Sequence, residues 1–116
     1  MVKVLVCGDR NWANRESIYQ VLNEFPFDTV IIHGAAPGAD SIADEIATEF
    51  GFQIERFPAN WSFGSRGGPI RNRQMLAVGK PDLVIAFHKN IASSKGTKNM
   101  LLQATLSGVP TKLYAK

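Results

Sequence analysis

Five short apolar segments, each separated from the next by a helix-like segment, constrain the fold of this chain more than any other feature. Strands are expected over residues 2–7, 29–33, 52–57, 83–87 and 111–114. Between them, apolar residues recur every three or four positions, as on one face of an α-helix. Strands that are apolar on both faces and alternate with helices indicate a parallel sheet that is covered on both sides.

Residues that start or stop helices mark the helical segments. The apolar stripes cover residues 18–25, 42–50 and 100–105, and a further helix is expected from Pro69 to Gly79. The first helix is expected to start at about Asn14 and to stop at Pro26. Gly51 and Gly108 suit helix C-terminal caps. With right-handed crossovers, the chain is predicted to be one α/β domain over residues 1–116, a Rossmann-like three-layer sandwich with strand order 3-2-1-4-5.

The composition is that of an ordinary globular protein with a mildly basic balance. The formal net charge is +3, which suits a phosphate-bearing partner without requiring one. No apolar run approaches the roughly 20 residues of a membrane helix, and residues 1–9 lack the regions of a signal peptide. Cys7 is the only cysteine, so no internal disulfide forms and a cytoplasmic setting is expected.

The loops that follow the first four strands are expected to carry the chemistry. The carboxyl ends of parallel strands meet at one edge of the sheet, and ligands bind there near the switch in strand order. Seven basic residues lie in these loops or in the next helical turn: Arg10, Arg66, Arg71, Arg73, Lys89, Lys95 and Lys98. This concentration predicts a positive edge that attracts an anionic ligand.

Small residues crowd the same loops, most of all in the segment VIIHGAAPGAD (residues 30–40). Where side chains are missing, backbone N–H groups can approach an anion closely, and the start of the next helix adds its positive dipole end. A close approach to phosphate or ribose is therefore predicted at Gly8, Gly34, Ala35, Gly38 and Gly96. A tight turn that merely needs glycine is the alternative at each position.

Asp9 and Asp40 are the carboxylates among these basic loops. Asp40 would repel a phosphate at the same helix start, so its predicted ligand is a ribose hydroxyl. Capping of the helix N-terminus is the alternative. If the protein is an enzyme, Asp9 and Asp40 are the candidate catalytic residues.

Aromatic and guanidinium side chains extend the predicted ligand-binding set. Trp12 and Trp61 lie in loops, and an aromatic face beside cations suits a nucleobase. Covering the end of the core is the alternative for both. Arg71 and Arg73, together with Arg10, offer guanidinium groups to phosphate, against the alternative of plain surface exposure.

The fourth loop leads into the last helix through Ser94, Lys95, Gly96 and Thr97. Their hydroxyl, ammonium and backbone groups are predicted to bind the ligand, whereas a helix N-terminal cap is the alternative for Thr97.

Metal or thiol chemistry is the alternative at the ends of three strands. Cys7, His33 and His88 occupy these ends, near Asp9, but their spacing matches no metal-binding motif. No metal and no cofactor are therefore predicted, and a nucleophilic thiol at Cys7 is the remaining alternative.

Four motifs, in a fixed order over nearly the whole chain, resemble a known family. They are VCGDRNW, HGAAPGADSIA, FPANW with GPIRNRQM, and AFHKN with SKGTKNM. This combination resembles the YspA-like (cpYpsA-related) branch of the SLOG superfamily, which is similar to the Smf/DprA DNA-processing proteins and the LOG enzymes. The resemblance implies a Rossmann-like fold, a pocket for nucleotides or nucleotide-derived molecules, and a bacterial or phage origin.

The resemblance to LOG enzymes bears on catalysis. LOG enzymes hydrolyse the N-glycosidic bond of nucleoside monophosphates and carry an arginine upstream of a G-T-x-x-E motif. Gly96 and Thr97 match that motif, and Arg71 or Arg73 matches the arginine, but Met100 stands at the glutamate position. A thioether neither accepts a proton nor stabilises a cationic transition state as a carboxylate does. This departure favours a binding protein over an enzyme.

Three functions follow from these features. The first is binding of a nucleotide or nucleotide-derived molecule, as a sensor or sequestering protein. The second is hydrolysis of an N-glycosidic or phosphate bond, and the third is binding of single-stranded nucleic acid, which the modest charge disfavours. No membrane partner is expected, and a homo-oligomer is a further expectation that rests on the LOG relatives.

Overall fold

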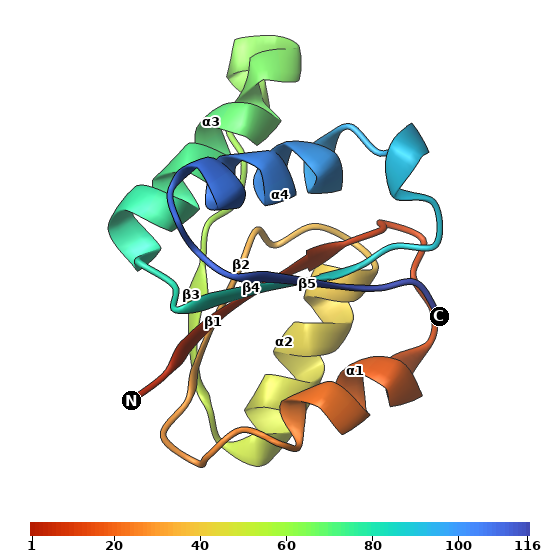
Figure 1. Cartoon of the computed structure of the whole chain (residues 1–116), viewed down its shortest axis with the longest axis vertical. Coiled ribbons are helices and arrows are strands. Elements are labelled where there is room, and N and C mark those ends of the chain that lie inside the picture. Colours follow the sequence, from red (N-terminus) through yellow and green to blue (C-terminus); the bar gives the residue numbers. More distant parts are fainter.

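The computed structural model describes all residues from 1 to 116, arranged as a sheet between two pairs of helices (Figure 1). Helices α1 and α2 cover one face of the sheet, and α3 and α4 cover the other. The strands are β1 (Lys3–Gly8), β2 (Val30–His33), β3 (Gln53–Arg56), β4 (Leu83–Phe87) and β5 (Thr111–Tyr114). The α-helices are α1 (Arg15–Leu22), α2 (Ala39–Phe50), α3 (Gly67–Gln74) and α4 (Gly96–Leu106).

The sheet confirms the predicted topology. All five strands are parallel, in the order β3-β2-β1-β4-β5. In the centre, Leu5 of β1 lies opposite Ile32 of β2 and Val84 of β4. Because the strands are parallel, the loops after β1, β2 and β4 open at the same edge. The strand order changes direction between β1 and β4, and a ligand site is expected at that point of the edge.

The core has two layers, one on each face of the sheet. On one face, Ile18 of α1 and Ile46 of α2 pack against Val4, Val6 and other buried side chains. On the other face, side chains of β1, β2 and β4 pack against Met75, Met100 and Ala104. The central strands are buried on both faces, as their continuous apolar sequences predict.

The helices differ from expectation mainly at their ends. Asn14 caps α1 through its side chain, which accepts from the amide of Ser17, but α1 ends at Leu22 rather than near Pro26. Helix α3 begins at Gly67, two residues before Pro69, and continues as a π-helical turn, η2 (Met75–Gly79). None of the helices combines the length and the apolar character that crossing a bilayer requires.

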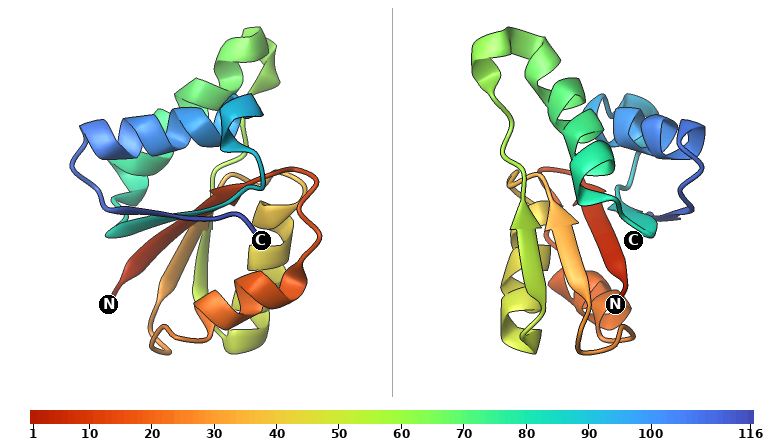
Figure 2. Two further views of the ribbon diagram at one scale, coloured as in Figure 1. Left: turned by 45° about the vertical axis from the view of Figure 1, so that its right-hand side comes forward. Right: turned by 90° about the vertical axis from the view of Figure 1, so that its left-hand side faces the viewer.

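The connection between β3 and α3 projects beyond the sheet. Figure 2 shows this segment rising past the carboxyl end of β3 before the chain returns as α3. It contains a short 3-10 helix, η1 (Trp61–Arg66), whose residues are all exposed. It therefore forms one side of the open edge of the sheet.

Candidate functional site

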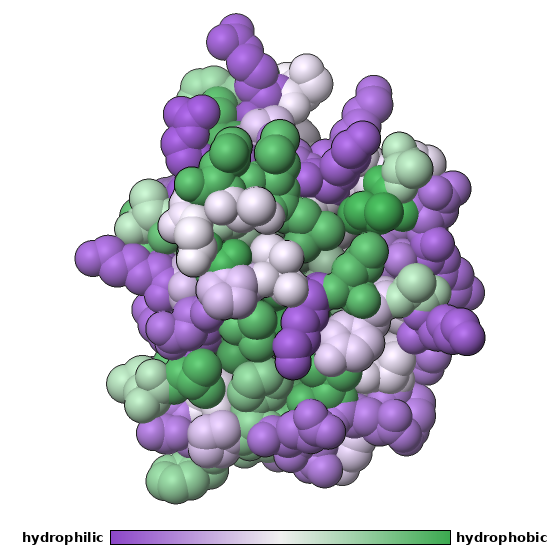
Figure 3. All heavy atoms as spheres, viewed as in Figure 1, coloured by the Kyte–Doolittle hydropathy of each residue, from purple (hydrophilic) through white to green (hydrophobic).

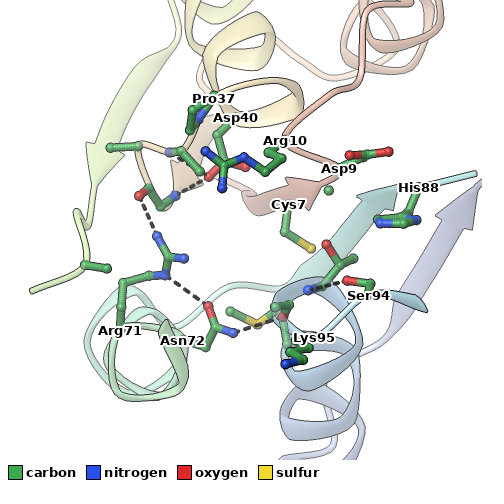
Figure 4. A pocket seen from close by; sticks show the side chains of 18 of the residues that line it. Cys7, Asp9, Arg10, Pro37, Asp40, Arg71, Asn72, His88, Ser94 and Lys95 are labelled. Atoms are coloured by element: carbon green, nitrogen blue, oxygen red, sulfur yellow. Dashed lines mark hydrogen bonds between the residues drawn. The ribbon is translucent and has the colours of Figure 1, made fainter. Parts of the chain in front are cut away.

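A cavity of about 760 Å³ opens at the carboxyl ends of β1, β2 and β4 (Figure 4). Its volume lies within the range of about 300–1,000 Å³ that is typical of small-molecule sites. The predicted ligand-binding residues that line it are Gly8, Asp9, Arg10, Gly34, Ala35, Asp40, Trp61, Arg71, Ser94, Lys95, Gly96 and Thr97. The structure thus brings residues from separate loops to one place.

Asp40 organises the wall of the cavity formed by the loop between β2 and α2. Its Oδ2 accepts from the amides of Gly34 (3.0 Å) and Ala36 (3.2 Å), and the residue is only 5% exposed. Burial raises the pKa of this carboxyl, and the bond from Ala36 is the largest opposing effect. Asp40 Oδ2 therefore binds the loop that precedes its helix instead of capping the helix. The residue also lines the cavity, and its contact with a ribose stays a prediction.

The two glycines of this loop leave room for other parts of the chain. A Cβ on Gly34 would overlap the guanidinium of Arg71, and one on Gly38 would overlap the backbone at Asp9 and Arg10. Gly38 also has φ 78° and ψ −123°, a conformation available essentially only to glycine. The close neighbours of these two glycines are thus an arginine and a neighbouring loop of the chain, and the approach to phosphate or ribose stays a prediction. Around Gly96, by contrast, the space is open.

Arg71 is held at the cavity by two hydrogen bonds. Its Nη1 donates to the carbonyl of Gly34 (2.5 Å), and its Nε donates to Oδ1 of Asn72 (3.1 Å). Asn72, which is 3% exposed, donates from Nδ2 to the carbonyl of Gly96 (3.2 Å) and to Asn99 Oδ1 (3.1 Å). Asn72 thereby fixes Arg71 relative to the start of α4. Asn72 is not among the predicted site residues, although it lies between the two predicted arginines.

The start of α4 supplies free donors. The amides of Lys95, Gly96 and Lys98 donate to no atom of the chain, whereas the amide of Thr97 donates to Ser94 Oγ (3.0 Å). Thr97 is therefore not the N-cap of α4, and the hydroxyl that accepts from its first turn belongs to Ser94. Free amides and the positive end of the helix dipole suit an anion here, beside Lys95 and across the cavity from Arg10 (Figure 4).

Trp12 and Arg73 lie away from the cavity. Trp12 is 4% exposed, its ring packs against Phe87 at 5.7 Å between centroids, and its Nε1 donates to the carbonyl of Asn14 (3.0 Å). It therefore covers the end of the core, which was the alternative to base stacking. Arg73 points to a separate groove between α3 and α4, because successive helical positions face different directions.

Trp61 is the aromatic residue that lies at the cavity mouth. It lines the cavity from the projecting segment, and it is 65% exposed. Its ring lies over Gly67 and Gly68 at the start of α3, where the missing side chains leave space for it. A large aromatic surface that is left open beside cations is available for stacking against a planar ligand.

His33 binds the loop between β2 and α2 and does not form a metal-ligating cluster with Cys7 and His88. Its Nδ1 accepts from the amide of Ala35 (2.9 Å), so the ring proton lies on Nε2, which donates to Asp44 Oδ2 (2.6 Å). This bond holds Ala35 at φ 56°, which is uncommon for alanine. No group of three or more metal-ligating side chains comes together in the chain.

Replacing Asp44 by asparagine is expected to destabilise the protein at neutral pH but not in strong acid. Arg56, which donates from Nε (2.7 Å), is the main cause of the lowered pKa of Asp44. A carboxyl with a lowered folded pKa adds stability above its unfolded value of about 3.9 and loses it as the pH falls through the folded value. Urea unfolding of both proteins should give stabilities that differ at neutral pH and converge in acid, below the folded pKa of Asp44. A gap that persisted there would contradict the ion pair.

Cys7 lies at the floor of the cavity as a neutral thiol. It is 8% exposed, its Sγ is 3.8 Å from the carbonyl oxygen of Ile85, and burial raises its pKa well above the usual range. We expect iodoacetamide at neutral pH to leave Cys7 unmodified in the folded protein and to alkylate it in urea, because the thiolate is the reactive form. Mass spectrometry measures both, and rapid alkylation without urea would indicate an activated thiol.

Met100 lies in the core below the start of α4 and lines the cavity. Neither Asp9 nor Asp40, the two candidate catalytic acids, lies at the position that Met100 occupies. Asp40 is bound to its loop, and Asp9 Oδ1 accepts from the amide of Asn11 (2.8 Å). Near α4, the cavity is therefore lined by the Met100 thioether and the Cys7 thiol, and α4 itself contributes no carboxylate.

Comparison with known proteins found a matching family and a similar phage protein. Residues 2–64 match the family described as YAcAr: YspA, cpYpsA-related SLOG family. The Gene 61 protein of Mycobacterium phage D29 is 33% identical over 120 residues, covering 95% of this chain and 94% of that protein.

Two solved structures share the fold. DNA processing protein A (DprA) from Streptococcus pneumoniae has a TM-score of 0.78 and 19% identity, covering 97% of this chain and 50% of that chain. An S. aureus MnaA–UDP co-structure has a TM-score of 0.56 and 17% identity, covering 97% of this chain and 29% of that chain. The chain thus spans about half of the DprA chain and less than a third of the MnaA chain.

Proposed function

Because the chain belongs to the YspA, cpYpsA-related SLOG family, we propose that it binds a nucleotide or a nucleotide-derived small molecule, as a sensor or sequestering protein. The observation that carries this proposal is the cavity at the carboxyl edge of the sheet, lined by Arg10, Arg71 and Lys95. A volume of about 760 Å³ accommodates a ligand of this size.

The phosphate end of the ligand is proposed to lie at the start of α4. The free amides of Lys95 and Gly96 and the dipole of an 11-residue helix favour a negative charge there. Arg71 faces the same space with its guanidinium already fixed by Gly34 and Asn72, so little side-chain entropy is lost on binding. This differs from a phosphate on the GAAPG loop, where three of the amides are already bonded to Asp40 and His33.

The base end is proposed to lie against Trp61. Its indole is the exposed aromatic surface at the cavity mouth, near enough to the lining to contact a ligand that reaches out of the cavity. Stacking on an aromatic side chain accepts any base, at about 1–3 kcal/mol each. The site therefore recognises the phosphate more strictly than the base.

Isothermal titration with a panel of mono-, di- and cyclic nucleotides, UDP and ADP-ribose tests the proposal. At least one of them is expected to bind to the wild type. Its affinity is expected to be lower for Arg71→Ala and the same as wild type for Arg73→Ala. Arg73 is a matched control because it lies two residues away and outside the cavity. Absence of binding across the panel, or equal losses in both variants, would contradict the proposed site.

The same mixtures distinguish binding from hydrolysis. Chromatography after incubation is expected to return each nucleotide intact, because Met100 replaces the LOG glutamate at the cavity floor. Release of free base or phosphate that is lost in Asp40→Asn would instead establish the hydrolase. Gel-shift with single-stranded DNA at physiological salt is expected to show no complex.

A further inference from the structure

The two faces of the sheet carry opposite charge. Residues 1–56 contain four Lys or Arg and nine Asp or Glu, a net charge of −5, whereas residues 57–116 contain nine Lys or Arg and one Asp, a net charge of +8. Helices α1 and α2, on one face, hold one Arg and five Asp or Glu, a net charge of −4, whereas α3 and α4, on the other face, hold three Lys or Arg and no acid, a net charge of +3 (Figure 1). The modest overall charge of +3 hides this separation.

The basic face also exposes aliphatic side chains. Leu102 and Leu106, one helical turn apart on α4, are 57% and 79% exposed, and Val78 after α3 is 62% exposed. Figure 3 shows apolar side chains gathered over the α3–α4 side, with hydrophilic side chains around them. On the opposite face, α1 and α2 expose no large apolar side chain.

A groove of about 350 Å³ lies between α3 and α4. Its lining includes Ala77, Gln103 and Ser107, which are next in sequence to Val78, Leu102 and Leu106. Leu76, Ala77 and Val109 give it apolar walls, and Arg73 and Lys80 provide cations at its edge. No acidic residue lines it. Neither cation forms a salt bridge within the chain. It is distinct from the cavity at the sheet edge, with which it shares no lining residue.

We propose that the groove between α3 and α4 docks an acidic amphipathic helix of a partner protein. Apolar anchors of that helix occupy the groove and cover Leu102 and Leu106, while its carboxylates pair with Arg73 and Lys80. Two copies joined symmetrically through this face would oppose their own cations, and the acidic face of another copy offers no exposed aliphatic anchor. Nucleic acid has the right charge but no aliphatic surface to fill the groove.

Selection of random peptides against the full chain tests this proposal. Helical sequences that combine Leu or Phe at helical spacing with Glu or Asp are expected to be enriched. The affinity of a synthetic peptide of the enriched sequence is measured by fluorescence anisotropy. The double variant Leu102→Ser/Leu106→Ser is expected to bind this peptide about tenfold or more weakly than the wild type does. The double variant Arg73→Glu/Lys80→Glu is expected to show a similar loss. All four residues are exposed, so the variants are expected to fold, and thermal unfolding checks this.

Matched variants on other surfaces provide the controls. Phe27→Ser, at an 87% exposed position between α1 and β2, and Lys116→Glu are expected to leave peptide affinity unchanged. Arg71→Ala should also leave it unchanged, which separates this surface from the nucleotide cavity. The proposal is overturned if no acidic peptide is enriched or if the groove variants bind the peptide normally. It also fails if the same variants instead abolish self-association, binding to phosphatidylserine vesicles or binding to single-stranded DNA.

Discussion

Replacing Phe87 by alanine is expected to lower the free energy of unfolding by about 3–5 kcal/mol. The side chain is fully buried at the end of β4, between Trp12 at 5.7 Å and Tyr114 at 5.4 Å between ring centroids. Alanine would leave a cavity that these rings cannot close, since both are fixed by neighbouring elements. Urea unfolding followed by circular dichroism measures the loss.

Two further substitutions show whether the loss comes from packing at this position. Phe87→Leu retains most of the volume and is expected to cost less than alanine does. Phe27→Ala removes an equally large ring from a position that is 87% exposed, so it should change stability by no more than about 0.5 kcal/mol. Equal losses for Phe87→Ala and Phe27→Ala would show that the aromatic cluster does not hold this end of the core.

The expected effect extends to the ligand cavity. The carbonyl of Phe87 accepts from the amide of Asp9 (2.8 Å), and the carbonyl of Asp9 accepts from the amide of Ala39 at the start of α2 (3.1 Å). The loop after β1 is thus tied to the ends of β4 and α2. Loss of packing at Phe87 is therefore expected to loosen the wall that carries Arg10.

The fold could be predicted from the sequence because its signals are repeated along the chain. Each strand is a short apolar segment between helical stripes, and the rules for parallel sheets leave few arrangements for such an alternation. Helix ends were less predictable. The sequence up to Phe25 continues the apolar stripe of α1, yet the helix ends at Leu22 because the following residues turn toward β2.

The sequence predicted where the site lies, but not what each of its side chains contacts. Topology brings the loops together whatever their side chains do, so Arg71, Ser94 and Gly96 were expected at one edge. Which atoms an aspartate binds depends on loop geometry, and the sequence did not predict that Asp40 Oδ2 binds the amides of its own loop. Trp12 and Trp61 are the same residue type in similar loops, but only the structure shows which one the core buries.

Replacing Gly34 by alanine is expected to weaken nucleotide binding nearly as much as removing Arg71 does. A Cβ on Gly34 would overlap the Arg71 guanidinium, which is the far end of a flexible side chain and moves more readily than backbone. The added methyl group therefore displaces the guanidinium and breaks its bond to the Gly34 carbonyl. A charge-assisted bond to phosphate is worth about 1.5–3 kcal/mol, so the expected loss is about 10–100-fold in affinity.

The double variant distinguishes this mechanism from a general disturbance of the loop. If alanine at position 34 acts only by moving Arg71, then Gly34→Ala in the Arg71→Ala background should have no further effect on affinity. If it distorts the loop that Asp40 holds, the two losses should add, and thermal unfolding should show a destabilised protein. Titration of the four proteins with one nucleotide measures this coupling. Additive losses would mean that Gly34 serves the loop and that Arg71 reaches the ligand independently of it.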